Sequence, residues 1–173
     1  MLFRSPYEAI CITHNETSTG VLEPLQALAA AARAHDPAML ILADVVTSLV
    51  GAPLEFDAWG LDLAFAGTQK CLALPPGLVT YAISNRALER ARSIPGRGFL
   101  LDFVRAVPET EAGKTLATPC VPLVCALQAQ LTRILTEGLP QRWARHVAMQ
   151  HETLAWAHQW QIEPYVTNPE ARS

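Results

Sequence analysis

A short run of apolar residues that ends in an acid constrains the fold more than any other feature of this chain. Residues 39–43 (MLILA) carry no polar side chain, and Asp44 follows them directly. A strand of this kind needs cover on both faces, which is typical of a parallel sheet flanked by helices. The alanine-rich residues 24–35 favour a helix. Further strand-like runs occur at residues 8–13, 61–66 and 78–83. This alternation predicts an α/β fold built on a mostly parallel sheet.

Polar residues follow three of these predicted strands. Residues 14–19 (HNETST) come after the first, Asp44 ends the second, and Lys70 lies just beyond the third. The carboxyl ends of parallel strands share one edge of a sheet, so we expect hydroxyls, an acid and a lysine in one crevice. Taken singly, each feature has a plainer interpretation. Residues 14–20 and Asp44 suit turns or helix caps, and Lys70 suits a surface loop.

The second half of the chain has a different character. Residues 93–118 contain scattered prolines and glycines and are expected to be irregular. Residues 122–136 have the apolar periodicity of a helix, Gly138 interrupts it, and residues 141–161 predict a second long helix. The tryptophans of this second helix are expected to pack against other parts of the protein; they are Trp143, Trp156 and Trp160.

The composition argues against several classes of protein. With 173 residues, half of them hydrophobic, the chain is long enough for one domain with a sizeable core. A net charge of −3 without any basic block argues against binding to nucleic acid or to an anionic membrane. No apolar run approaches the length that spans a bilayer, and residues 1–6 do not begin a secretory signal.

The cysteines and histidines suggest neither disulfides nor a metal site. The chain has four cysteines and no Cys-x-x-Cys pair, so we expect reduced and mostly buried thiols in a cytoplasmic protein. His151 and Glu152 begin like a zinc-protease motif, but Ala155 stands where the second histidine would be, so no metal is expected.

An acid, a lysine and a hydroxyl-rich loop together suit pyridoxal phosphate. This cofactor forms a Schiff base with a lysine and needs an acid against its pyridine nitrogen. Lys70 and Asp44 can supply these groups. Val46 can present an apolar side chain beneath the ring. Hydroxyl and phosphate contacts could come from Thr17 or Ser18 and from Thr68 or Gln69.

Four blocks of sequence carry a resemblance to a known family. They are residues 13–25 (THNETSTGVLEPL), 42–62, 66–78 (AGTQKCLALPPGL) and 117–121 (ATPCV). In order and spacing they resemble the class V aminotransferases of fold type I, and they are most similar to the alanine–glyoxylate and serine–pyruvate aminotransferases. The resemblance implies transfer of an amino group from alanine or serine to a 2-oxo acid, glyoxylate or pyruvate.

The resemblance also implies roles for individual residues. Lys70 would hold pyridoxal phosphate as a Schiff base and then shuttle a proton, while Asp44 would pair with the pyridine nitrogen. Val46 would pack under the ring, Thr17 would contact its oxygen side, and Gln69 would help to bind the phosphate.

A homodimer is implied as well. In the family the phosphate is also reached from the neighbouring subunit, and Thr118 matches the threonine that does so. Thr115 stands where the family has a phosphate-binding tyrosine, so that contact is not carried over.

Compared with the family, the chain is expected to be truncated at both ends. Residues 1–137 would form part of the large, pyridoxal-phosphate-binding domain, and residues 138–173 the linking helix and the start of the C-terminal small domain. Much apolar surface would then stay uncovered. Two alternatives remain open. One is a class V lyase or desulfurase, although those relatives usually place a histidine where this chain has Gln69. The other is a non-catalytic remnant.

Overall fold

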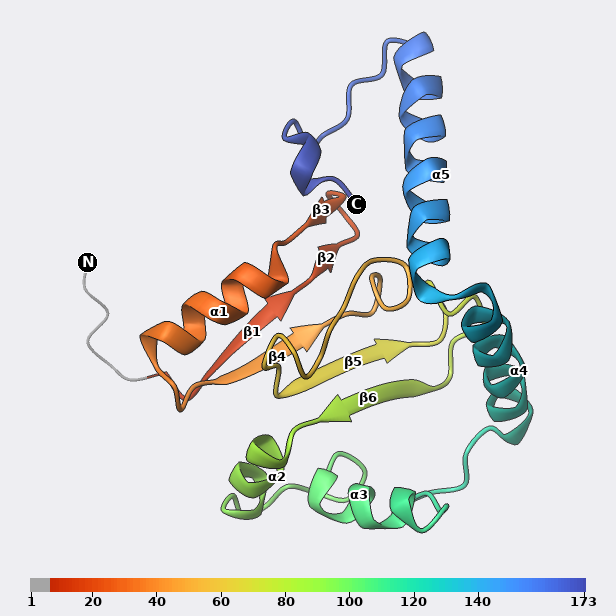
Figure 1. Ribbon diagram of the computed structural model, residues 1–173. Coiled ribbons are helices and arrows are strands. Elements are labelled where there is room, and N and C mark those ends of the chain that lie inside the picture. The colour runs from red at the N-terminus through yellow and green to blue at the C-terminus, as the bar shows by residue number, and fades with distance from the viewer. Residues whose placement is uncertain (1–6) are drawn as a thin grey trace.

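The computed structural model describes residues 7–173, so the expectation about a secretory signal in residues 1–6 lies outside it. The described chain is a mixed α/β fold around a four-stranded sheet with the order β1–β4–β5–β6 (Figure 1). The β1–β4 and β4–β5 pairs are parallel, whereas β6 runs antiparallel to β5. The strands of the sheet are β1 (Ala9–Thr13), β4 (Leu40–Asp44), β5 (Leu63–Gly67) and β6 (Val79–Ile83). The prediction of a mostly parallel sheet is confirmed.

Helices and one small hairpin complete the fold. The hairpin β2–β3 (Asn15–Glu16 and Val21–Leu22) occupies the polar segment after β1. The helices are α1 (Leu25–His35), α2 (Asn85–Arg92), α3 (Phe103–Glu111), α4 (Val121–Glu137) and α5 (Leu139–Gln159), followed by the short 3-10 helix η1 (Pro169–Ala171). None of the helices within residues 7–173 is both long and apolar enough to cross a membrane.

Helix α3 corrects the expectation that residues 93–118 are irregular. The carboxylate of Asp102 accepts a hydrogen bond from the backbone N–H of Val104 at 3.0 Å and so caps the first turn. Pro108 lies inside this helix, which is why the sequence favoured an irregular segment. The rings of Phe103 and Tyr81, whose centroids are 5.0 Å apart, pack the helix against the edge strand β6.

The hydrophobic core lies between α1 and one face of the sheet. Leu25 and Ala29 of α1 and Ile41 and Ala43 of β4 are almost completely buried there. Because side chains alternate along a strand, the next residues point to the opposite face. On that face the side chain of Val79 is 66% exposed, and Cys11 and Thr13 are exposed as well. The second face of the sheet therefore lacks full cover in the described part of the chain.

The expectation of mostly buried cysteines is wrong, and the expectation of packed tryptophans holds only for Trp143, which is half-buried. Three of the four cysteines are exposed, and Cys71 is half-buried. Trp156 and Trp160 are 56% and 67% exposed, because the far half of α5 projects beyond the sheet and finds little to pack against (Figure 1). The expected uncovered apolar surface is thus present in the described residues.

Asp62 connects several elements at the end of the sheet where the parallel strands begin. Its side chain is buried, and its carboxylate accepts hydrogen bonds from the backbone N–H of Ile41 at 2.8 Å and from the hydroxyl of Ser84 at 2.7 Å. It also forms ion pairs with Arg33 of α1, at 3.1 Å, and with Arg86 of α2. Desolvation opposes ionisation of this carboxyl, but the hydrogen bonds from Arg86, Ile41, Ser84 and Arg33 outweigh it and lower its pKa.

We predict that Asp62→Asn lowers the free energy of unfolding by about 3 kcal/mol, because it leaves two guanidinium groups without their carboxylate. Urea unfolding followed by circular dichroism measures this change. Glu89→Gln is the control, since it breaks the exposed ion pair between Glu89 and Arg92 and should cost less than about 1 kcal/mol. Equal losses in the two variants would contradict the role given to Asp62.

Candidate functional site

The carboxyl ends of β1, β4 and β5 lie at one edge of the sheet, as the sequence predicts. The parallel register pairs Thr13 with Asp44 and Asp44 with Phe65, so Asp44 sits between the ends of its two neighbours. The β2–β3 hairpin, the loop after β4 and the first half of α5 surround this edge (Figure 1). The polar segments that follow the three strands are therefore neighbours in space.

The loop that carries Lys70 is tightly folded. Thr68 is fully buried, and its hydroxyl donates a hydrogen bond to the carbonyl of Pro75 at 2.7 Å. The N–H of Leu74 returns to the carbonyl of Thr68, and the N–H of Ala73 to that of Lys70. Ala73 has a φ of 55°, a left-handed conformation that a tight turn imposes. The Lys70 side chain itself is exposed on this ordered loop.

A shallow, open hollow of about 500 Å³ lies beside Lys70. It brings Lys70 together with Thr17, from the segment after β1, and with Thr47, from the loop after β4. Three further residues come from α5, namely Arg142, Arg145 and His146. The hollow thus joins four segments that are far apart in the sequence, and its lining includes two of the predicted site residues, Lys70 and Thr17.

The other predicted site residues do not line this hollow. Asp44 is half-buried at the end of β4, where one carboxylate oxygen accepts a hydrogen bond from the N–H of Val46 at 2.9 Å. Its second oxygen makes no hydrogen bond within residues 7–173 and is free to accept one. Gln69 is exposed and folds back over Gly67. Thr118 is exposed on the segment between α3 and α4.

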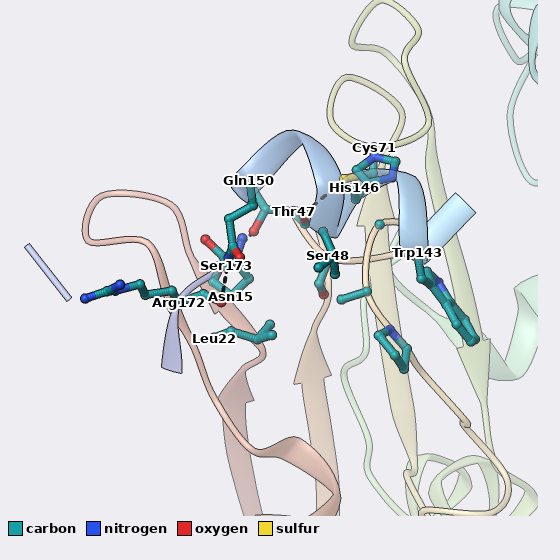
Figure 2. A pocket seen from close by; sticks show the side chains of 14 residues that line it. Asn15, Leu22, Thr47, Ser48, Cys71, Trp143, His146, Gln150, Arg172 and Ser173 are labelled. Carbon is teal, nitrogen blue, oxygen red and sulfur yellow. Dashed lines mark hydrogen bonds between the residues drawn. The ribbon is translucent and has the colours of Figure 1, made fainter. Parts of the chain in front are cut away.

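A second cavity, of about 260 Å³, lies between the β2–β3 hairpin, the loop after β4 and α5 (Figure 2). Polar atoms of three of its residues are buried without a partner in the described structure: the Asn15 amide oxygen, the Ser48 hydroxyl and the Trp143 indole nitrogen. Figure 2 shows Cys71 and His146 on the α5 side of this cavity, and both also line the hollow beside Lys70. The two spaces are therefore adjacent.

A cluster of charges from the α4–α5 corner borders the hollow, and the sequence did not predict it. Glu137, at the end of α4, forms ion pairs with Arg142 at 3.1 Å and with Arg145 at 2.6 Å. The hydrogen bonds from Arg145 and Arg142 outweigh desolvation and lower the pKa of Glu137 to about 2. The residues Arg142, Arg145 and His146 share one face of α5 by their spacing, which is the signal that could have revealed them.

Cys71 lies between the hollow beside Lys70 and the second cavity, and it lines both. Its thiol donates a hydrogen bond to the carbonyl of Thr47 at 3.2 Å. Burial raises the pKa of this thiol, and the charges of Arg142 and Lys70 only partly offset that effect. Cys71 is therefore expected to react more slowly than the three exposed cysteines.

Comparison with known proteins identifies the family. The sequence model of the class-V aminotransferases matches residues 2–165, and the chain belongs to this family. It is 36% identical to alanine–glyoxylate aminotransferase 1 of Saccharomyces cerevisiae over 157 residues, which cover 86% of this chain and 41% of that protein. It is 32% identical to a serine–glyoxylate aminotransferase of Methylorubrum extorquens, over 96% of this chain and 42% of that protein.

A solved structure agrees with this membership. Pyridoxamine–pyruvate aminotransferase from Mesorhizobium loti superposes with a TM-score of 0.85 and 25% identity, over 95% of this chain and 42% of that one. The fold is therefore that of the fold type I aminotransferases, as the sequence predicts. The chain spans about two fifths of the length of the relatives that it matches.

The functional groups at the carboxyl edge of the sheet fit pyridoxal phosphate. An exposed lysine amine can form a Schiff base, a carboxylate oxygen without a partner can bind a ring N–H, and Thr17 offers a hydroxyl in the same hollow as the lysine. Within residues 7–173 no group of His, Cys, Asp and Glu side chains could hold a metal ion.

The environment of Cys71 gives a chemical test of this geometry. We predict that iodoacetamide at pH 8 alkylates Cys71 at least about tenfold more slowly than the exposed Cys11, Cys120 and Cys125, because its thiol is half-buried and its pKa is raised. Mass spectrometry of the peptides at successive times measures the four rates. A Cys71 rate equal to that of the exposed thiols would contradict the packing of the lysine loop.

Proposed function

We propose that this chain anchors pyridoxal phosphate and carries out, or contributes to, transamination between a small amino acid and a 2-oxo acid. Family membership supports the reaction class. The names of the relatives, alanine–glyoxylate and serine–glyoxylate aminotransferase, support alanine or serine as donor and glyoxylate as acceptor, with pyruvate as a further candidate. The observation that carries the proposal is the hollow that Lys70 shares with Thr17, at the edge where Asp44 has a free carboxylate oxygen.

Each proposed residue has a distinct task. Bound pyridoxal phosphate supplies an electron sink for the bonds at the amino acid Cα. Lys70 would bind the cofactor covalently and would then move the proton at that carbon; its side chain is exposed on an ordered loop. Asp44 would accept the ring N–H with its free oxygen and keep that nitrogen protonated. Its other oxygen is held by the N–H of Val46, so the carboxylate is oriented in advance.

The remaining contacts complete the proposed site. Val46 would pack beneath the ring, and Thr17 would donate its hydroxyl to the ring oxygen. Gln69 would bind the phosphate, and rotation of its exposed side chain away from Gly67 would bring its amide to that group.

We propose that the chain works as a homodimer and that Thr118 reaches the phosphate of the neighbouring subunit. Thr118 is exposed just before α4, and α4 exposes Val121 and Leu135 to 57% and 71%. Such a surface favours contact with another chain or domain.

In the proposed domain division, residues 1–137 belong to the cofactor-binding domain, and α5 begins the segment that leads to the second domain. The four free cysteines suit the reducing cytoplasm.

The chain contains two lysines, which makes the cofactor assignment simple to test. We predict that the purified protein with pyridoxal phosphate develops the visible absorption of a protonated Schiff base, that Lys70→Ala abolishes this band, and that Lys114→Ala retains it. Absorption spectroscopy makes the measurement. A band that survives Lys70→Ala would contradict the assignment. A band that L-alanine fails to convert would mean that the chain binds the cofactor without transaminating.

We predict that Asp44→Asn still binds pyridoxal phosphate but slows its conversion by L-alanine by about 100-fold, because the ring nitrogen loses its anionic partner. The rate at which the visible band disappears after adding L-alanine measures this step. Asp57→Asn is the matched control, since Asp57 is exposed in the loop between β4 and β5. An unchanged rate in Asp44→Asn would count against the role of Asp44.

A further inference from the structure

Arg142 connects helix α5 to the loop of Lys70. It lies in the first turn of α5, yet its guanidinium is buried and donates a hydrogen bond to the carbonyl of Cys71 at 2.7 Å. The two residues are 71 positions apart in the sequence. A charged donor to a carbonyl that is adjacent in sequence to Lys70 is a strong and directional contact.

Glu137 fixes the direction of this contact. One nitrogen of the Arg142 guanidinium donates to Glu137 at 3.1 Å, and another donates to Cys71. A planar guanidinium that is bonded on two sides has little freedom to rotate, so it acts as a rigid brace between the α4–α5 corner and the lysine loop.

The loop depends on few anchors near Lys70. Thr68 closes the loop through Pro75, but Lys70 and Cys71 lie inside the closed segment. At Cys71 the thiol bonds to Thr47 and the carbonyl accepts from Arg142. No ion pair or side-chain hydrogen bond of Lys70 holds it in place within residues 7–173. The position of its amine therefore depends on the backbone next to it.

We propose that Arg142 is a positioning residue for Lys70, which it holds in place through the Cys71 carbonyl. This inference rests on the proposed function of Lys70 and extends it, because it makes the lysine loop sensitive to the position of α5. Movement of the α4–α5 corner would reach the backbone next to Lys70 through the buried guanidinium of Arg142.

The chain offers a matched control in Arg145. Arg145 also borders the hollow and also binds Glu137, at 2.6 and 3.0 Å, but it donates no hydrogen bond to the lysine loop. Arg142→Gln and Arg145→Gln each remove one positive charge and one partner of Glu137. Only Arg142→Gln also removes the donor to Cys71.

The first arm of the test needs no cofactor. In Arg142→Gln we expect alkylation of Cys71 by iodoacetamide to be at least about tenfold faster, and deuterium exchange to be faster at the amides of Ala73 and Leu74. In Arg145→Gln both rates should stay within about twofold of the parent protein. The direction of the change in alkylation rate separates two effects. Loss of the Arg142 charge alone raises the pKa of the Cys71 thiol and would slow alkylation, whereas loosening of the loop would make it faster. Unchanged or equal rates in the two variants overturn the proposal.

Arg142→Lys keeps the test decisive if Arg142→Gln does not fold. A lysine retains the charge, but its N–H donors sit on a single nitrogen and cannot bond to Glu137 and Cys71 in the fixed plane of a guanidinium. We expect rates between those of the parent protein and Arg142→Gln, with an unchanged urea midpoint for unfolding. Suppose that Arg142→Gln does not fold but Arg142→Lys does. Rates of Cys71 alkylation and of deuterium exchange in Arg142→Lys that equal those of the parent protein would then overturn the proposal.

The second arm separates this proposal from the proposed function. With pyridoxal phosphate, Arg142→Gln should form the Lys70-dependent band with about tenfold weaker apparent affinity, and Arg145→Gln with parent-like affinity. Equal affinities would overturn the positioning role while the function of Lys70 stands. If the parent protein forms no band, the proposed function fails, and the alkylation and exchange rates still decide whether Arg142 holds the loop.

Discussion

The rest of the structure depends on the buried carboxylate of Asp62. It joins α1, β4 and α2 at the edge of the sheet where the parallel strands begin, through Arg33, Ile41 and Arg86. These bonds satisfy a charge that would otherwise be costly to bury. These ion pairs lie at the end of the sheet opposite to Asp44 and Lys70, so the groups that hold α1, β4 and α2 together are separate from those proposed for chemistry.

Much of the fold follows from local patterns. Apolar runs bounded by polar residues predicted all four strands of the sheet, and periodicity predicted α4 and α5 to within a few residues. Helix α3 was not predicted, because Pro108 hides a helix whose beginning depends on the cap at Asp102. Burial was harder to predict, since the exposure of Cys11 and Trp160 depends on which surfaces the rest of the protein covers.

The residues of the candidate site also differ in how well the sequence predicts them. Lys70, Asp44 and Thr17 lie at or just beyond strand ends, and the rule that parallel strands share a carboxyl edge places them at one edge of the sheet. Arg142 follows no such rule. Its contact with Cys71 depends on how α5 crosses the sheet edge, and no local pattern fixes that crossing. The sequence thus indicates candidate residues for binding a cofactor, whereas the structure adds the contact from which the positioning role of Arg142 is proposed.

The central claim is that Lys70 is the residue that bonds to pyridoxal phosphate. Reduction of the loaded protein with borohydride converts a Schiff base to a stable amine, and peptide mass spectrometry then locates it. We predict that the pyridoxyl group is found on the peptide that contains Lys70 and not on the one that contains Lys114, the other lysine of the chain. Modification of Lys114 alone, or of both lysines to the same extent, would contradict the claim.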